Sequence, residues 1–593
     1  MNDLEHSVKK PAARPAPFVD EVERTSHVTC PPEEREASNG AVRESLVRRL
    51  WEKLLPLLVV PERRTLVAWA PVVIPLTILP LMIPLMRLEL NEPLFGDTYV
   101  FQYTGWCIRH GLRLYQDMGM ADGPFIHFLH AVMQMVAGLT ERGFRMADLT
   151  CEAVGGLTLG LLLTPKADLS RAARVGHRAT WGALGAAIWL SQYLCNGWEA
   201  TTERETYYAL FGSAGMVLLY VSATWQNDRR AAIGTFIGAF LVSSQVFGKP
   251  TGIGYVLLGG LSVLLNDANT ARTRRVRMRM FAMGALACGV AVLFALLMWG
   301  SIRGYFFWCF KIPWRGNRFL FGVSWTKLLF SEWDPIRLMA LSSLFVGVAA
   351  IVTGIIPKRA LGLALAPALF WFGACLQARG YIYQAIPAVA ASYALGLAIL
   401  SGLWQDCTRP RWANRRGVLA ALAMVFAGQT CIDNYHKSPY RWKGDPAEWT
   451  ARPHEFAALE QKVGRYLEEH TQPDDRVFAY SAGENAHVVL FYARRRTASP
   501  FFHSFWLDPV GLLPQSRIKP GPKDLAALEA MQSEIREVAC GSVQENPPAA
   551  MAFNLLPQVF KVCPNVEKLI QTHYDEATTI GDYHIYMRKP QHS

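Results

Sequence analysis

The segment NEPLFGDTYVFQYTGWCIRHGLRLYQDMGMADGP, residues 91–124, governs how the rest of this chain is interpreted. It directly follows the apolar run 66–88, which is long enough to cross the hydrocarbon core of a membrane. Its acidic residues alternate with aromatic ones: Glu92, Asp97, Asp117 and Asp122 stand among Tyr99, Tyr103, Trp106 and Tyr115. Acids set among aromatics immediately outside a membrane span predict a site where a polar substrate meets a lipid.

The composition of the whole chain indicates a membrane protein. Of its 593 residues 51% are hydrophobic and only 18% are charged, which is too apolar for a soluble protein of this size. The net charge of +12 could indicate nucleic-acid binding, but no nucleic-acid-binding fold pattern is recognisable. In membrane proteins, basic residues instead mark cytoplasmic loops and contacts with anionic headgroups. We therefore expect membrane lipids, and no nucleic acid, as partners.

Apolar runs predict a polytopic α-helical protein with about eleven spans. The predicted spans lie at 66–88, 146–164, 179–196, 207–225, 231–247, 253–266, 281–300, 336–355, 360–376, 383–403 and 417–431. The shorter run 125–139 contains His127 and His130, and we interpret it as a helix in the membrane interface. With the N-terminus inside, this assignment places the Arg-rich loops in the cytoplasm, as the positive-inside rule requires, and it makes the aromatic-rich segment 301–334 a long loop on the opposite side.

The remaining parts of the chain follow from this topology. Residues 1–64 are charged and rich in proline, so we expect a disordered cytoplasmic tail with an amphipathic helix and no cleavable signal peptide. Residues 65–431 form the transmembrane part, with the external loop 89–124. Residues 432–593 read as a soluble α/β domain on the outer side, with helices at 454–470, 485–493 and 523–537 and strands at 476–482 and 578–590. Cys540 and Cys563 can form a disulfide there if the compartment is oxidising.

The acids and aromatics of the external loop 89–124 are compatible with glycosyl transfer from a lipid phosphate. Such a reaction needs a base for the acceptor hydroxyl, and cations or a metal for the departing phosphate. One carboxylate at the membrane surface and a few basic residues would supply both.

Three segments of the chain resemble GT-C glycosyltransferases, specifically the polyprenyl-phosphate-dependent class that includes the protein O-mannosyltransferases and the lipid A aminoarabinose transferase. Residues 91–118 are similar to the first external loop of that class: Asp97 and Tyr99 match its acid–tyrosine pair, and Gly111, Tyr115 and Asp117 match its Gly-x-x-x-Tyr-x-Asp segment. FGKPTG (247–252) and QARGYIYQAIPAVAA (377–391) resemble two further segments. The sequence departs from the class at Asp122-Gly123 and at Gln384, which leaves the donor identity and any metal site open.

The resemblance implies a role for each candidate residue. Asp97 would be the general base, and Glu205 or Glu203 would bind the acceptor or a divalent cation. The donor phosphate would be bound by Lys249, Arg379, Arg315 and Arg318. The substrate would be bound by Tyr99, Tyr115, Asp117, Tyr381, Tyr383 and Gln384. Structural explanations stay open beside these roles, since Asp97 can cap a helix, the glutamates suit a helix N-terminus and Lys249 can extend to the interface. His127 and His130 have a spacing that permits metal binding, so the metal requirement is left open.

The chain is therefore expected to be an inverting glycosyltransferase of the inner (cytoplasmic) membrane of a bacterium, acting on its periplasmic face. It would move a sugar from a polyprenyl-phosphate donor to a lipid, glycan or protein hydroxyl. Two alternatives remain: a polymerase or ligase that uses a lipid-diphosphate glycan, and a flippase or transporter of a lipid-linked glycan. Transporters commonly show internal repeats, which are not visible in this sequence.

Overall fold

The computed structural model describes residues 66–197, 200–266, 270–320, 322–332, 334–379, 381–407, 457–481, 486–501, 507–513, 519–554 and 556–590. The predicted N-terminal tail, residues 1–64, and the predicted span 417–431 lie outside these residues.

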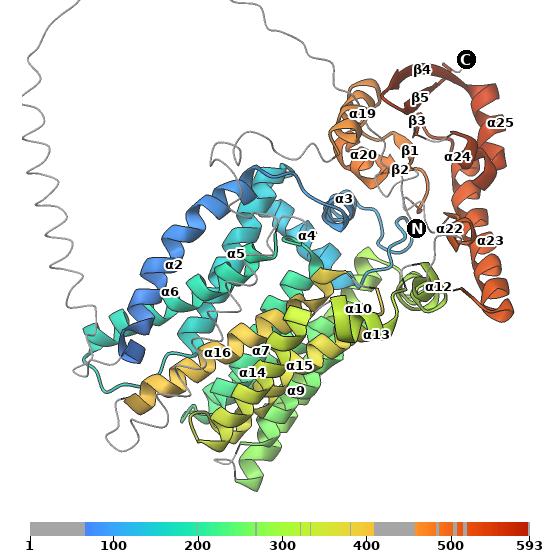
Figure 1. Cartoon of the computed structure of the whole chain (residues 1–593). Helices are drawn as coiled ribbons and strands as arrows, with labels where there is room; N and C mark the ends of the chain where they lie inside the picture. The colour runs from blue at the N-terminus through green and yellow to red at the C-terminus, as the bar shows by residue number, and fades with distance from the viewer. Residues whose placement is uncertain are drawn as a thin grey trace, which may run out of the picture. The chain divides into compact units, whose positions relative to one another are not determined.

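Long helices build the part of the chain before residue 408 (Figure 1). They are α2 (Leu66–Asn91), α5 (Glu141–Leu162), α6 (Arg171–Cys195), α7 (Arg204–Ser222), α8 (Asp228–Ser244), α9 (Ile253–Leu264), α10 (Ala271–Trp299), α14 (Asp334–Val352), α15 (Leu361–Leu376) and α16 (Ile386–Cys407). Each coincides with one of the predicted spans before residue 404. Within the described residues, five helices are both long and apolar enough to cross a membrane: those in 69–91, 228–247, 271–299, 358–376 and 383–405. For the other helices, crossing the membrane stays a prediction.

Small residues allow the helices to approach closely. A Cβ atom on Gly160 of α5 would lie 2.0 Å from the carbonyl oxygen of Trp181 on α6, and one on Gly185 would lie 2.3 Å from that of Gly156. Such glycine contacts are typical of helix pairs in membranes, where packing rather than burial from water drives association. Figure 1 shows α5 and α2 alongside α6.

The basic loops meet at one end of this bundle. Lys166 Nζ, after α5, donates to the carbonyl oxygen of Thr224, after α7, over 3.4 Å. Asn266 Nδ2, after α9, and Arg277, near the start of α10, both donate to the carbonyl oxygen of Ala223, at 3.3 and 3.2 Å. The loops that the charge pattern assigns to the cytoplasm therefore share one side.

The external loop contains one helix and leads into another. α3 (Asp97–Arg109) is buried along most of its length, because it packs against α4 (Pro124–Ala137) and the later helix α20 (Ala486–Ala493). α4 corresponds to the predicted interfacial helix 125–139. Its C-terminal half exposes Val132, Met135 and Val136, so one side of the helix is apolar and open while His127 and His130 are buried.

The segment 301–334, expected to be a long loop, is instead largely helical in the part that the structure describes. Ser301 and Ser324 accept hydrogen bonds from the backbone at helix starts, and the aromatic run between them continues as helical turns. The turns are α11 (Ile302–Phe306), η4 (Phe307–Lys311), α12 (Ile312–Leu320), α13 (Trp325–Lys327) and η5 (Leu328–Glu332).

The described C-terminal residues form a mixed five-stranded sheet with helices on both sides (Figure 1). The strand order is β2-β1-β3-β5-β4, in which β1 runs parallel to β2 and β3 while β5 runs antiparallel to β3 and β4. The strands are β1 (Arg476–Tyr480), β2 (Arg496–Thr497), β3 (Ala550–Phe553), β4 (Tyr574–Ile580) and β5 (Tyr583–Arg588). The helices are α19 (Ala458–His470), α20, α22 (Pro509–Leu512), α23 (Pro522–Glu545), α24 (Leu556–Val562) and α25 (Pro564–His573).

Every secondary-structure element predicted for this region has a counterpart in the sheet or its helices. The central strand β3 was not predicted, because it is only four residues long and follows a proline-rich turn. Cys540 of α23 and Cys563, just before α25, form a disulfide whose Cα atoms are 5.5 Å apart.

Candidate active site

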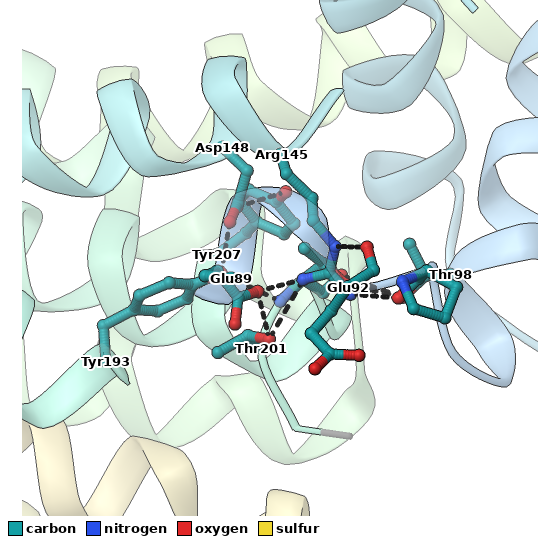
Figure 2. A network of polar contacts seen from close by, with 10 residues as sticks. Glu89, Glu92, Thr98, Arg145, Asp148, Tyr193, Thr201 and Tyr207 are labelled. Atoms are coloured by element: carbon teal, nitrogen blue, oxygen red, sulfur yellow. Dashed lines mark hydrogen bonds and ion pairs between the residues drawn. The ribbon is translucent and has the colours of Figure 1, made fainter. Parts of the chain in front are cut away.

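A buried arginine connects the segments that flank the site. Arg145, on α5, is fully buried and donates to the Glu89 carboxylate, to the carbonyl oxygen of Glu92 at 2.8 Å and to that of Pro93 (Figure 2). The same Glu89 carboxylate accepts a hydrogen bond from Thr201 Oγ1 at 2.6 Å. Arg145 and Glu89 thereby fix the end of α2 to the segment that leads into α7.

Further hydrogen bonds hold that segment beside α3. The hydroxyls of Thr98 and Thr202 are 2.9 Å apart, and the backbone N–H of Thr202 donates to Tyr193 Oη over 3.1 Å. Tyr193 in turn donates to the Asp148 carboxylate, which also accepts from Tyr207 at 2.7 Å (Figure 2). The start of α3 and the start of α7 are therefore neighbours.

Asp97 and Glu203 lie at these two helix starts. Asp97 is the first residue of α3 and is half-buried, and no hydrogen bond or ion pair to its carboxylate occurs within the described residues. Glu203 precedes α7, is 3% exposed, and its Oε2 has no hydrogen-bond partner in that part of the chain. Burial raises the pKa of Glu203 well above its ordinary value, and the negative charges of Asp97 and Glu205 raise it further.

A chain of alternating charges runs next to these carboxyls. Asp122 forms an ion pair with Arg204, whose Nε lies 3.2 Å from Glu205 Oε1, and the same oxygen accepts from Lys249 Nζ at 2.8 Å. Burial lowers the pKa of Lys249 to about 8, although Glu205 acts in the opposite direction. The second oxygen of Glu205 has no partner among the described residues.

Two glycines bring the external loop to the turn that carries Lys249. Gly123 N donates to the carbonyl oxygen of Gly248 over 3.3 Å. A Cβ atom on Gly123 would lie 2.0 Å from the carbonyl oxygen of Phe247, and one on Gly248 would lie 2.2 Å from the Tyr208 ring. Larger residues at either position would force the turn away from the loop.

Arg379 and Tyr383 complete the cluster. Burial and the charge of Arg204 both lower the pKa of Arg379, and Asp97 and Tyr383 are among its electrostatic neighbours. The rings of Tyr381 and Tyr383 are stacked with centroids 5.4 Å apart, and Tyr381 is the more exposed of the two. One carboxylate without a bound partner, Asp97, thus lies within electrostatic range of two cations, Arg204 and Arg379.

The cluster continues into a pocket between α7, α9, α15 and the turn that contains Lys249. The predicted residues Glu205, Lys249 and Gln384 all line it. The other lining residues are Tyr208, Gln245, Thr251, Gly252, Gly254, Tyr255, Leu369, Phe370, Gly373, Ala374, Gln377 and Pro387.

Comparison with known proteins identifies the architecture. No family model and no curated protein sequence matches the chain. The crystal structure of ArnT from Cupriavidus metallidurans bound to undecaprenyl phosphate matches with a TM-score of 0.50 at 12% identity, over 87% of this chain and 99% of that chain. The chain has the GT-C fold.

Weaker similarity extends to the archaeal enzyme AglB from Archaeoglobus fulgidus, solved with an inhibitory peptide and a dolichol-phosphate. That structure matches with a TM-score of 0.40 at 11% identity and covers 87% of this chain and 74% of its own. The match to the ArnT structure alone confirms the sequence resemblance, at the level of the fold.

Three predicted substrate residues of the external loop make contacts within the protein. Tyr99 donates to Glu141 and lies 3.4 Å from the Tyr492 hydroxyl, Tyr115 donates to the carbonyl oxygen of Asp122 at 2.5 Å, and the Asp117 carboxylate accepts from Arg113 N at 2.7 Å. These positions favour a role in shaping the loop, because each polar group is already used within the protein.

Of the two predicted phosphate ligands in α12, the structure describes only the side chain of Arg315. Arg315 is exposed, and no contact between it and the cluster occurs in the described part of the chain. The side chain of Arg318 lies outside the described residues. Lys311, just before α12, forms an ion pair with Glu534 of α23 at 2.7 Å, so its charge is balanced away from the cluster.

The two histidines of α4 are used inside the protein. His127 Nδ1 lies 2.7 Å from Thr104 Oγ1, and His130 Nδ1 lies 3.1 Å from Gln102 Nε2. Burial lowers the pKa of His127 to about 3, so this ring is neutral. Within the described residues no three His, Cys, Asp or Glu side chains gather in an arrangement that could hold a metal ion.

Sequence reasoning missed Arg204 and Tyr208 of the cluster. Arg204 stands between two glutamates in TERET, and that alternation of charge was the available signal. Asp122 was noted as one of the acids of the external loop and as a departure from the expected pattern, but it was given no role; its ion pair with Arg204 explains why an acid is accommodated there.

Proposed function

We propose that the chain is an inverting glycosyltransferase that moves a sugar from a polyprenyl-phosphate donor to a hydroxyl of a lipid, glycan or protein acceptor. The observation that carries the proposal is Asp97, a half-buried carboxylate without a bound partner in the described residues, next to the cations Arg204 and Arg379. The fold shared with ArnT, which was solved with undecaprenyl phosphate, supports a lipid-linked donor.

In this proposal Asp97 acts as the general base. It removes the proton of the acceptor hydroxyl as that oxygen bonds to the anomeric carbon of the sugar. The bond from this carbon to the phosphate oxygen breaks at the same time, so the configuration inverts and polyprenyl phosphate leaves. Arg204, Lys249 and Arg379 stabilise the negative charge that develops on the phosphate, and Arg suits this role because it can make bidentate contacts.

Two features support a periplasmic site. The basic loops share the end of the bundle opposite to the external loop, which matches the positive-inside rule. The disulfide between Cys540 and Cys563 belongs to an oxidising compartment. We therefore assign the site and the C-terminal sheet to the periplasmic face of a bacterial inner membrane.

The test is transfer by the purified full-length protein from synthetic polyprenyl-phosphate sugars to a membrane extract. We expect Asp97→Asn to lower kcat by about 10²–10⁴-fold, which is the usual contribution of a general base. Asp117→Asn is the matched control, since its carboxylate belongs to the same loop and accepts a hydrogen bond from Arg113 N. A fully active Asp97→Asn protein would exclude Asp97 as the base.

The same assay separates the remaining alternatives. Transfer only from lipid diphosphates would favour a polymerase or ligase, and binding without transfer would favour a transporter. An EDTA arm decides the metal requirement. Loss of activity in EDTA that Mg²⁺ or Mn²⁺ restores would require a metal site in addition to the three cations.

A further inference from the structure

The pocket beyond Lys249 contains buried polar atoms that no described residue satisfies. These atoms are Glu205 Oε2, Tyr208 Oη, Gln245 Oε1, Tyr255 Oη, Gln377 Oε1 and both amide atoms of Gln384. Glu205, Gln245, Tyr255 and Gln384 are each at most 2% exposed. An unsatisfied buried polar group costs free energy, so several of them around one pocket indicate a site built for a polar ligand.

The chemistry of these atoms defines the ligand. The carboxylate and amide oxygens can only accept hydrogen bonds, while the tyrosine hydroxyls can do both. The ligand must therefore be rich in hydrogen-bond donors and also carry acceptors, which describes the hydroxyl groups of a sugar. The Tyr255 ring packs against Phe370 with centroids 4.1 Å apart, so an apolar wall stands beside the polar groups.

The charges of the pocket argue against an ionised ligand group. Its lining charges, Glu205 and Lys249, are paired at 2.8 Å. An extra carboxylate would face the free oxygens of Glu205 and the glutamines, and an extra ammonium would face Lys249 and the nearby Arg204. A neutral ring avoids both repulsions.

We infer that this pocket is the subsite for the donor sugar, and that it selects a neutral sugar ring rich in hydroxyl groups. The inference rests on the proposed function, because it places the donor phosphate beside Lys249 and Arg379 and the sugar beyond them. Tyr255, Gln245 and Gln384 would contact the sugar and not the phosphate.

The experiment compares two lipids on the purified full-length protein: polyprenyl phosphate, and polyprenyl phosphate that carries a neutral hexose. Tyr255→Phe keeps the ring against Phe370 and removes only the hydroxyl, and Gln384→Leu removes the amide. We expect each variant to weaken binding of the glycosylated lipid about three- to tenfold, while the bare lipid binds as in the wild type. Tyr480→Phe is the matched control, since Tyr480 is a buried tyrosine in β1 whose hydroxyl also has no partner in the described residues.

The outcomes separate this inference from the proposed function. Equal loss of both lipids, or no loss of either, in Tyr255→Phe and Gln384→Leu would overturn the sugar subsite. A wild-type protein that binds neither lipid would overturn the proposed function together with the subsite. Stronger binding of a lipid-linked uronic acid or amino sugar than of the neutral sugar would overturn the selectivity for a neutral ring.

Discussion

Asp97 and Glu203 occupy the same kind of position, the start of a helix, yet their surroundings assign them different roles. Glu203 is buried, and its pKa is raised by burial and by the charges of Asp97 and Glu205, which favours the protonated form. A protonated carboxyl can donate a hydrogen bond but cannot act as a base. Asp97 is more exposed, and in the proposed function it is the carboxylate that accepts the proton.

Lys249 predicts a pH dependence for donor binding. Its pKa lies at about 8, so the ammonium is charged at neutral pH and loses its charge as the pH rises through this value. Since a neutral amine binds phosphate weakly, the KM for the donor should rise above pH 8. The measurement is the pH profile of KM for the donor from pH 6 to 9.5.

The control for this prediction is Lys249→Arg, because arginine stays protonated over the whole range. In this variant the alkaline rise in KM should disappear. Lys249→Gln should bind the donor weakly at every pH. If Lys249→Arg retains the alkaline limb, the titrating group lies elsewhere in the cluster and the assignment of Lys249 is wrong.

Part of the charged cluster was predictable from the sequence. Glu205, Lys249 and Arg379 each stand where an apolar run begins or ends, and a charge there is costly unless it is used. The partners Arg204 and Asp122 were not predictable, because they are far apart in the chain and meet only after folding. For the same reason, the sequence could not show that the hydroxyl groups of Tyr208 and Tyr255 have no hydrogen-bond partner in the described residues.

At the scale of single elements, α5 links the site to the bundle through Arg145. Its guanidinium donates hydrogen bonds both to the end of α2 and to the start of the external loop. The Glu89 carboxylate that it contacts also accepts a hydrogen bond from Thr201. Nothing in the sequence of α5 indicates these contacts, because the acceptors, the Glu89 carboxylate and two backbone oxygens, belong to another segment. An arginine that becomes buried in a helix must have an acceptor nearby, but the sequence does not show which residue supplies it.

Arg145→Met should destabilise the protein strongly. It leaves the buried Glu89 carboxylate without this cation, and the loss of one partner of a buried pair typically costs about 3–5 kcal/mol. We expect a lower thermal midpoint in detergent, and a lower kcat in the protein that remains folded, because Asp97 and Glu203 lose their common support. The double variant Glu89→Gln/Arg145→Met should recover part of the thermal midpoint. An unchanged midpoint in Arg145→Met would contradict the linking role.

Segment 301–334 and β3 show where element prediction failed. The aromatic run in 301–320 has neither the length nor the continuous apolarity of a span, so it read as a loop, yet local serine caps and packing against the C-terminal residues make it helical. β3 lies between two longer strands and is fully buried, so its pairing partners rather than its own four residues define it.

At the scale of the whole molecule, the end of α16 and the C-terminal residues that follow it contact different ends of the helix bundle. α16 ends on the side of the basic loops, since Ser401 Oγ donates to the carbonyl oxygen of Leu163 over 2.6 Å. The C-terminal residues contact the external loop: Tyr103 Oη donates to the carbonyl oxygen of Arg495 at 3.0 Å, and Gly119 N donates to that of Pro500 at 2.7 Å. We propose that the predicted span 417–431, which lies outside the described residues, returns the chain across the membrane.

Reporter fusions test this topology. An enzyme that folds only when its disulfides form should be inactive when fused after Lys166 or Lys358, in basic loops, and active when fused after Lys589. A fusion after Cys407 should be inactive, and moving the junction past the span 417–431, to Lys443, should make it active. If the Lys166 fusion is active instead, the whole chain is inverted with its N-terminus outside, because the contacts between Asp122 and Arg204 and between Thr98 and Thr202 keep the segments before and after α4 on one side, and the site would face the cytoplasm. That orientation would place the Arg-rich loops outside, against the positive-inside rule, and would leave the Cys540–Cys563 disulfide on the inside while the site residues keep their geometry.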